Sequence, residues 1–160
     1  MQVDRGCFLC RVDSKLFLAE NDYFYSVLDE YPVSPGHVLI VPKIHIASLR
    51  ELPPFQGVAM IEITQKTLSK LSVRTLRGFY LKKAASSKDE KSKGLCETAL
   101  NVLSRHTDLG DFNLGINDGP DAGQTIPHLH IHVMPRFAGD GGTGVGGVRH
   151  IFPASGNYKL

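Results

Sequence analysis

The stretch 128–133 constrains the fold of this chain more than any other, because histidine alternates with an aliphatic residue throughout it. Successive side chains of a β-strand point to opposite faces, so we expect a strand with imidazoles on one face and buried aliphatic side chains on the other. Imidazole can act as a nucleophile, a proton carrier or a metal ligand. The row formed by His128, His130 and His132 therefore allows phosphoryl chemistry, acid–base chemistry or zinc binding.

Length and composition predict one soluble globular domain over 1–160, with 42% hydrophobic and 21% charged side chains among 160 residues. The formal net charge of +2 is too balanced to favour nucleic acid or a membrane surface as a partner. No stretch approaches the roughly 20 continuous apolar residues of a membrane helix, and the N-terminus lacks the layout of a signal peptide. We therefore expect a cytoplasmic protein.

The chain has three cysteines, two of them spaced as Cys7-x-x-Cys10. An odd number argues against a secreted disulfide framework and favours a metal site or a reduced pair. By itself the pair is compatible with half of a zinc site, a redox pair or two incidental thiols. Cys96 lies in an apolar helical pattern, where a small buried side chain is expected.

Two β-rich runs, 23–28 and 38–41, are joined by the Pro- and Gly-containing stretch 29–36 and predict a hairpin. Asp29 ends the first run, where a carboxylate can hold a pair of hydroxyls such as those of a ribose, or can simply be a solvated turn residue. The short apolar run 16–18 is consistent with a further small strand.

The alternating run 111–117 predicts a half-buried strand. The Gly-containing turn 118–123 joins it to the histidine strand, so we expect an antiparallel pair. This arrangement places Asn117 and Gln124 at the rim of one cleft.

Helical periodicity follows Pro53-Pro54, and we expect this main helix to cover one face of the sheet. A second helical pattern precedes His106, and the polar run 82–94 between the two patterns predicts an exposed loop or insertion. The Gly-rich segment 139–160 predicts a flexible tail. The element order predicts an α+β fold with a largely antiparallel sheet. The apolar positions of the first pattern are Phe55, Val58, Ile61, Leu68 and Leu71, and those of the second are Leu95, Ala99, Val102 and Leu103.

Three interpretations compete for the histidine row. A purely structural role would require three buried hydrogen-bond partners. One zinc ion would take one or two of the histidines more easily than all three, because positions two apart on a strand are roughly 7 Å from each other. Nucleophilic phosphoryl transfer accounts for the whole row, since one imidazole can attack phosphorus while its neighbours hold the phosphate oxygens.

At this point the chain resembles the histidine triad family of nucleotide hydrolases and transferases. The stretch 128–134 resembles the family signature, 34–45 resembles its second strand and the turn after it, and 118–125 resembles its phosphate-side loop. The resemblance runs in order from Cys7 to Arg136. It departs at the polar insertion before Gly94, which is longer than the family's usual helical connection.

The resemblance implies a role for each matching residue. His130 corresponds to the nucleophile that takes the α-phosphate of the nucleotide, and His128 and His132 correspond to the residues that position the imidazole and the phosphate. The remaining positions imply substrate contacts: Gln124 and Thr125 to phosphate oxygens and the leaving group, Asn117 to the phosphate region, and Asp29 to the ribose hydroxyls.

Bacterial-type members of the family bind a structural zinc, and the resemblance implies that Cys7, Cys10, His45 and His128 do so here. The reaction itself requires no metal. The resemblance also implies a homodimer with a nucleotide substrate that is cleaved at its α-phosphate through a nucleotidyl-histidine intermediate. The loop 118–125 and Pro135-Arg136 favour dinucleoside polyphosphates, and nucleoside phosphoramidates are the other substrate class implied. The alternative is a regulatory module that binds a nucleotide without turning it over.

Overall fold

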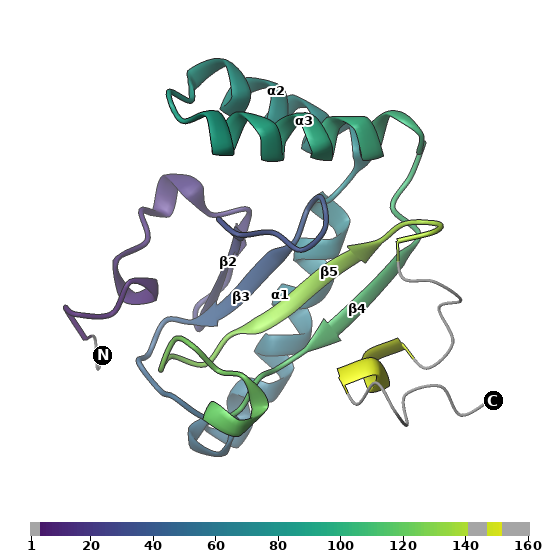
Figure 1. Ribbon diagram of the computed structural model, residues 1–160. Coiled ribbons are helices and arrows are strands. Elements are labelled where there is room, and N and C mark those ends of the chain that lie inside the picture. Colours follow the sequence, from purple (N-terminus) through teal and green to yellow (C-terminus); the bar gives the residue numbers. More distant parts are fainter. Residues whose placement is uncertain (1–3, 141–146, 152–160) are drawn as a thin grey trace.

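A five-stranded antiparallel sheet forms the centre of the computed structural model, which describes residues 4–140 and 147–151. The strand order is β1-β2-β3-β5-β4, so the α+β class is confirmed (Figure 1). Residue Leu28 of β2 pairs with Val38 of β3, and Gly115 of β4 pairs with His132 of β5. The strands are β1 (Ala19–Glu20), β2 (Phe24–Leu28), β3 (Val38–Pro42), β4 (Asp111–Gly115) and β5 (Ile131–Arg136).

Three α-helices accompany the sheet in the described part of the chain. The first lies along one face of the sheet, and the other two lie side by side beyond one end of it (Figure 1). Ser72 caps the second helix by accepting the Thr75 N–H, and Asp89 caps the third by accepting the Ser92 N–H. None of these helices is long and apolar enough to cross a membrane. The helices are α1 (Gly57–Lys70), α2 (Val73–Ser86) and α3 (Glu90–Ser104).

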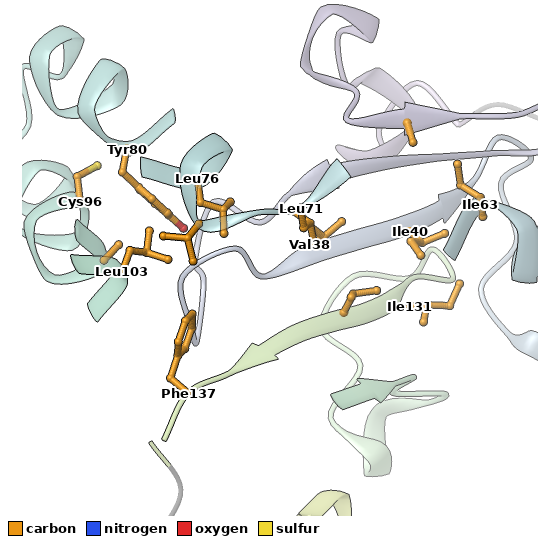
Figure 2. Close-up of a cluster of buried hydrophobic side chains, with 14 of the residues drawn as sticks. Val38, Ile40, Ile63, Leu71, Leu76, Tyr80, Cys96, Leu103, Ile131 and Phe137 are labelled. Carbon is orange, nitrogen blue, oxygen red and sulfur yellow. The ribbon is translucent and has the colours of Figure 1, made fainter. Parts of the chain in front are cut away.

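The central strand β3 is buried along its whole length and separates two apolar clusters. Val38 and Ile40 face the larger cluster, which also holds side chains from all three α-helices (Figure 2). Leu39 and Val41 face the smaller cluster on the opposite side, where Leu9 of the N-terminal segment packs. The alternation along β3 therefore assigns α1 to one face and the N-terminal segment to the other.

The buried face of α1 differs from the predicted one. Phe55, Val58 and Ile61 are 67%, 78% and 59% exposed, whereas Ile63 is fully buried and Thr67 donates to the Ser26 hydroxyl at 2.9 Å. Ile63 lies two residues after Ile61, about 160° away around the helix axis. The periodic pattern predicted the helix correctly but indicated the wrong buried face for its first half. Apolar residues spaced by three form a stripe on a helix, and the spacing alone does not show whether the sheet covers that stripe.

The stretch 82–94, predicted to be an exposed loop or insertion, is not a loop, because it ends α2 and begins α3. Only Ser87, Lys88 and Asp89 separate the two helices. The polar side chains lie mainly on outer faces of a helical hairpin, and the apolar ones enter the main core (Figure 2). These core residues are Leu76, Tyr80, Cys96, Ala99 and Leu103.

The helical hairpin supports the loop between β2 and β3. Gly36 has a φ of 86°, and a Cβ at this position would lie 2.5 Å from Leu76 Cδ1, so both the backbone and the packing require glycine. Its N–H also donates to the Tyr80 hydroxyl at 3.0 Å. The hairpin thus holds the residue immediately before His37.

Two strand predictions need correction. The histidine strand begins only at Ile131, so His128 and His130 precede it. The run 16–18 is not a strand, since a 3-10 helix spans Ser14–Leu16 and β1 begins at Ala19. Of the Gly-rich segment, 147–151 forms a 3-10 helix, and 141–146 and 152–160 lie outside the described residues.

Candidate active site and metal centre

His130 is held with one ring nitrogen bonded and the other available. The residue is 5% exposed and lies between fully buried Leu129 and Ile131, which is 6% exposed, and both anchor the backbone in the core. Its Nδ1 lies 2.7 Å from the carbonyl oxygen of His128, so Nδ1 carries the proton and donates it. When the ring carries this proton alone, Nε2 keeps its lone pair, which is the form required of a nucleophile.

His132 lies next to His130, with ring centroids 4.9 Å apart, and it begins a chain of polar contacts. Its Nδ1 is 2.9 Å from His37 Nε2. His37 Nδ1 is in turn 3.2 Å from a carboxylate oxygen of Asp29. The structure therefore brings Asp29 into contact with His37, in addition to placing it at the end of β2.

His132 and His37 are both neutral at neutral pH. Burial, together with the neighbouring His130 and His37, lowers the pKa of His132 to about 4, although Asp29 opposes the shift. Burial also lowers the pKa of His37, again against the effect of Asp29.

His37 was not predicted as a site residue, although it lies inside a stretch that resembles the family. Its position two residues before Leu39 places it in phase with the side chains of β3 that face away from α1. That phase was readable from the sequence. The pairing of β3 with β5, which brings His37 to His132, was not.

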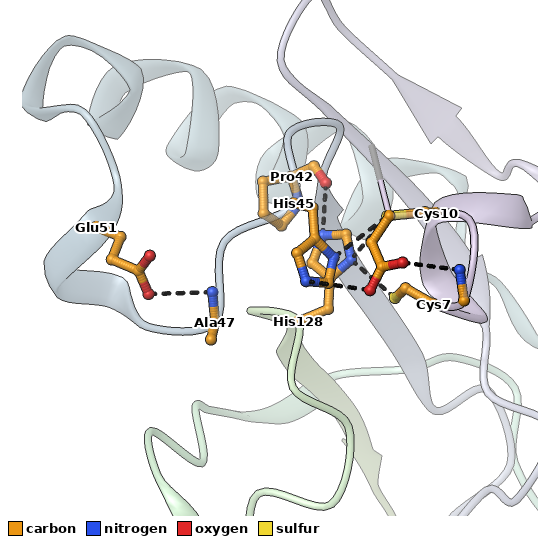
Figure 3. Close-up of polar contacts among 9 residues, drawn as sticks. Cys7, Cys10, Pro42, His45, Ala47, Glu51 and His128 are labelled. Carbon is orange, nitrogen blue, oxygen red and sulfur yellow. Dashed lines mark hydrogen bonds and ion pairs between the residues drawn. The ribbon is translucent and has the colours of Figure 1, made fainter. Parts of the chain in front are cut away.

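Cys7, Cys10, His45 and His128 converge at the other end of the histidine row (Figure 3). Their four ligand atoms all lie within 4.8 Å of one another. Cys7 Sγ is 3.4 Å and Cys10 Sγ 3.6 Å from His128 Nδ1, and Cys10 Sγ is 3.4 Å from His45 Nδ1. The structure thus brings together the four predicted metal ligands.

The donor set and its spacing fit a tetrahedral zinc ion. Bond lengths of about 2.3 Å to sulfur and about 2.0 Å to nitrogen place S and N ligands about 3.5 Å apart. His128 Nε2 is 3.0 Å from the Pro42 carbonyl oxygen, to which it donates, so Nδ1 points at the thiols with a free lone pair. Asp4 lies 4.0 Å from His45 Nε2 and favours the same tautomer there. Burial raises the pKa of the Cys10 thiol, and a bound cation would counter that effect.

The predicted phosphate-side residues lie on the loop before the histidine row. The side chain of Gln124 makes two hydrogen bonds: one N–H of its amide nitrogen donates to the Ala47 carbonyl at 2.8 Å, and its amide oxygen accepts the Gly119 N–H at 2.9 Å. Asn117 is half-buried, and Thr125 is exposed. Gln124 therefore shapes the loop.

An apolar cavity of about 500 Å³ opens beside Asp29. Its walls come from the N-terminal segment, β2, β3 and the loop before the histidine row, and Asp29 supplies a carboxylate at its edge. Such a slot fits a flat, largely apolar ring with hydroxyl groups nearby. Its apolar walls include Phe8, Val27, Leu39 and Ile126.

Comparison with known proteins gives consistent matches. A family model described as HIT domain matches residues 11–139. The chain is 31% identical over 138 residues to adenylylsulfatase HINT3 of Arabidopsis thaliana, a match that covers 84% of this chain and 54% of that protein. It is 30% identical over 126 residues to the AP-4-A phosphorylase of Mycobacterium tuberculosis, with 78% and 48% covered.

The chain therefore spans about half the length of these curated relatives. Among solved structures, a Zn-bound histidine triad family protein from Mycobacterium smegmatis matches with a TM-score of 0.54 and 28% identity, covering 85% of this chain and 78% of that one.

Proposed function

Since the chain belongs to the histidine triad (HIT) family, we propose that it hydrolyses or transfers nucleotide derivatives at the α-phosphate through a nucleotidyl-His130 intermediate. The observation that carries this proposal is the tautomer of His130. Its Nδ1–H is held by the His128 carbonyl, which leaves the Nε2 lone pair for attack on phosphorus. A buried imidazole held in this way needs no base to activate it.

In the proposed first step, His130 Nε2 forms a bond to the α-phosphorus and the bond to the leaving group breaks. Water then attacks the phosphorus and releases His130, or another acceptor takes the nucleotidyl group. His128 and His132 position the imidazole and the phosphate on either side. The proposed substrate contacts are Gln124 and Thr125 for phosphate oxygens and the leaving group, Asn117 for the phosphate region and Asp29 for the ribose.

For the substrate, we propose a dinucleoside polyphosphate or a nucleoside phosphoramidate. The apolar slot of about 500 Å³ supports a nucleoside end, with Phe8 and Leu39 against the base and Asp29 at the ribose. The names of two relatives, an adenylylsulfatase and an AP-4-A phosphorylase, support a reaction at a nucleotide phosphate.

We propose that the four-residue metal centre holds a structural zinc. Cys7 and Cys10 would be bound as thiolates and His45 and His128 through Nδ1. Four protein ligands close the coordination sphere, so the ion would join the N-terminal segment to the end of β3 and take no part in the reaction. Cys7 and Cys10 form no disulfide, which agrees with this use of the thiols.

We also propose a homodimer that covers the outward stripe of α1. Val58 and Ile61 of α1, and Phe55 in the 3-10 helix Pro54–Gln56 just before it, expose more than half of their surfaces, so three large apolar side chains lie uncovered close together in the sequence. Equilibrium sedimentation of the wild type and of Ile61→Asp tests this. A dimer that the substitution does not weaken would contradict the use of this face.

The central experiment is to trap the adduct. The protein is mixed with an α-³²P-labelled dinucleoside tetraphosphate or adenosine phosphoramidate, denatured rapidly in alkali and separated from free nucleotide. Label retained by the wild type and not by His130→Asn supports the proposal, with turnover in the variant reduced at least about 10⁴-fold.

The matched control is His106→Asn, which changes a histidine outside the row and should keep both adduct and turnover. A wild type that binds these nucleotides, forms no adduct and shows no turnover would instead identify a non-catalytic binding module.

A further inference from the structure

We infer that the site accepts a nucleotide whose ribose carries a second nucleotide on its 3′ oxygen, so that the substrate is the 5′ end of a short oligonucleotide. This inference rests on the proposed function and deepens it, because it concerns the part of the substrate that stays on His130. The chemical steps are those of the proposed function. The observation that carries the inference is a second cavity beside Asp29, which we call the lysine recess.

The lysine recess has a volume of about 550 Å³ and adjoins the apolar slot proposed for the nucleoside. The two cavities share a wall that includes Val27, Leu28 and Asp29. A ribose held by Asp29 therefore has its 2′ and 3′ oxygens at the boundary between them. A substituent on the 3′ oxygen enters the recess, whereas the 2′ hydroxyl remains for Asp29. The other sides of the recess include Lys15, Phe17, Leu18, Phe79, Lys82 and Lys83.

The helical hairpin forms one side of the lysine recess. The C-terminal part of α2 supplies Phe79, Lys82 and Lys83, and the N-terminal segment, which lies below the turn of the hairpin in Figure 1, supplies Lys15. The hairpin includes the stretch where the sequence departs from the family pattern, so the resemblance does not imply this recess. Four basic side chains and no acidic one lie on α2, so the balanced charge of the whole chain hides a local excess.

The three lysines of the recess are available to an anion. Within 4–140 and 147–151, none of their ammonium groups forms an ion pair. Lys15 and Lys82 are exposed, and Lys83 Nζ lies 5.8 Å from the ring centroid of Phe79, which holds this ammonium group at the recess. A phosphate group that enters beside the ribose therefore meets unpaired positive charge.

The charges of the recess favour a phosphodiester over a terminal phosphate. Asp29 and Glu30 also line it, so the three ammonium groups face two carboxylates and leave a small positive excess. A terminal phosphate carries about −1.5 to −2 charge at neutral pH, whereas a phosphodiester carries a single negative charge. Repulsion from the two carboxylates is therefore weaker for the diester, which is the linkage to a next nucleotide.

Beyond the lysines, the recess offers an apolar surface for a base. The side chains of Leu16 and Phe79 line it and are 62% and 38% exposed. Phe17 already stacks on Tyr25, with ring centroids 4.3 Å apart. Phe79 is thus the aromatic side chain on which a second base would stack, and stacking of this kind tolerates any base. A bare phosphate would leave this surface uncovered.

The experiment compares three 4-nitrophenyl esters formed at a 5′-phosphate: those of AMP, of the 3′→5′ dinucleotide pApA and of adenosine 3′,5′-bisphosphate. All three have the same leaving group, so differences in kcat/KM report the ribose substituent. For the wild type we expect kcat/KM to be about 10-fold higher for the dinucleotide than for AMP, mainly through KM, and less than about 3-fold higher for the bisphosphate. An equal gain for the bisphosphate would overturn the assignment of a second nucleotide.

Variants locate this preference in the recess. The double variant Lys82→Gln/Lys83→Gln should reduce the ratio of the two kcat/KM values, dinucleotide to AMP, to about 2, and Phe79→Leu should reduce it to about 3. The matched control is Lys88→Gln/Lys91→Gln, which removes the same charge from exposed positions outside the recess and should keep the wild-type ratio.

Two kinetic outcomes overturn the inference. One is an equal reduction of the ratio in the control variant. The other is an unchanged ratio in the variant of Lys82 and Lys83. Lysines that only compensated the negative end of the α2 dipole would lower the free energy of unfolding and leave the ratio unchanged.

Calorimetric titration with the products AMP and pApA gives a readout without turnover. We expect the wild type to bind pApA about 10-fold more tightly, with an advantage that decreases as salt is raised. Equal Kd values overturn the inference. Tighter binding of pApA by a wild type that forms no nucleotidyl adduct overturns the proposed function alone, whereas an adduct combined with equal affinities and equal rates overturns this inference alone.

Discussion

Two clusters of metal-ligating side chains flank His130, and one is suited to a metal ion whereas the other is suited to a proton. Cys7, Cys10, His45 and His128 lie at one end of the histidine row, and Asp29, His37 and His132 lie at the other. In both clusters one atom from each residue lies within 4.8 Å of the others. Residue type and proximity alone would therefore assign a metal to both.

The contact distances separate the two clusters. In the cysteine cluster, which consists of Cys7, Cys10, His45 and His128, the S···N distances of 3.4–3.6 Å equal the separation of two ligands on one ion. In the carboxylate cluster, which consists of Asp29, His37 and His132, the two contacts of His37 are 2.9 Å to His132 and 3.2 Å to Asp29. They use both ring nitrogens of His37. An imidazole offers only one nitrogen to a given ion, so the second cluster is suited to passing a proton.

The largest expected effect comes from breaking the cysteine cluster. Cys7→Ser should reduce bound zinc from near one equivalent to less than about a tenth and lower the free energy of unfolding by about 3–5 kcal/mol, since binding energy of a structural metal is folding energy. Elemental analysis and urea unfolding measure the two effects.

The control for that substitution is Cys96→Ala, which removes a buried cysteine outside the cluster. It should cost about 1–2 kcal/mol through lost packing and leave the zinc content unchanged. Equal zinc content in Cys7→Ser and Cys96→Ala would contradict the proposal that the cysteine cluster binds the zinc.

The carboxylate cluster should instead make the free energy of unfolding depend on pH. His132 has a folded-state pKa of about 4, below its ordinary 6.5, so between these pH values the unfolded chain binds a proton at this position that the folded chain does not. The stability associated with neutral His132 is present above pH 6.5 and is lost as the pH falls towards 4. The loss amounts to at most about 3 kcal/mol.

Urea unfolding at about pH 7.5 and about pH 4.5 measures this effect. His132→Gln should lose less stability between the two pH values than the wild type does, and His106→Gln should lose the same amount as the wild type. Parallel losses in His132→Gln and the wild type would show that His132 is not held neutral by burial.

The smallest effect concerns the support of the carboxylate cluster by the helical hairpin. Tyr80→Phe removes the hydroxyl that accepts the Gly36 N–H and should cost about 1 kcal/mol. Because Gly36 precedes His37, we also expect a modest loss of kcat, measured beside Phe79→Leu on the exposed side of α2. A larger loss in Phe79→Leu would mean that the hairpin does not act through Gly36.

Local patterns predicted much of the fold. The runs 23–28, 38–41 and 111–117 became β2, β3 and β4, because strand alternation and turn residues are local signals. The same signals failed at 82–94, where polar residues on the outer faces of two helices read as a loop. They also failed on α1, where an uncovered apolar stripe is indistinguishable from a covered one until its neighbours are known.

The candidate site shows the same division. Residue types and the resemblance named the four members of the metal centre and the histidine row, since these depend on side-chain chemistry and spacing. They gave Asp29 a single partner, the ribose, and gave His37 none. The pairing of β3 with β5 creates the contact between His37 and His132, and no local pattern encodes that pairing.

The sequence by itself determined the chemistry available to this protein: a row of imidazoles, two thiols near the N-terminus and a turn carboxylate. Tertiary structure alone decided how that chemistry is divided. Burial sets which imidazoles stay neutral, and the hydrogen bond on one ring nitrogen sets what the other can do. His128 turns its Nδ1 to the cysteines, His130 keeps Nε2 free, and His132 is bonded to His37, because folding gives each a different neighbour.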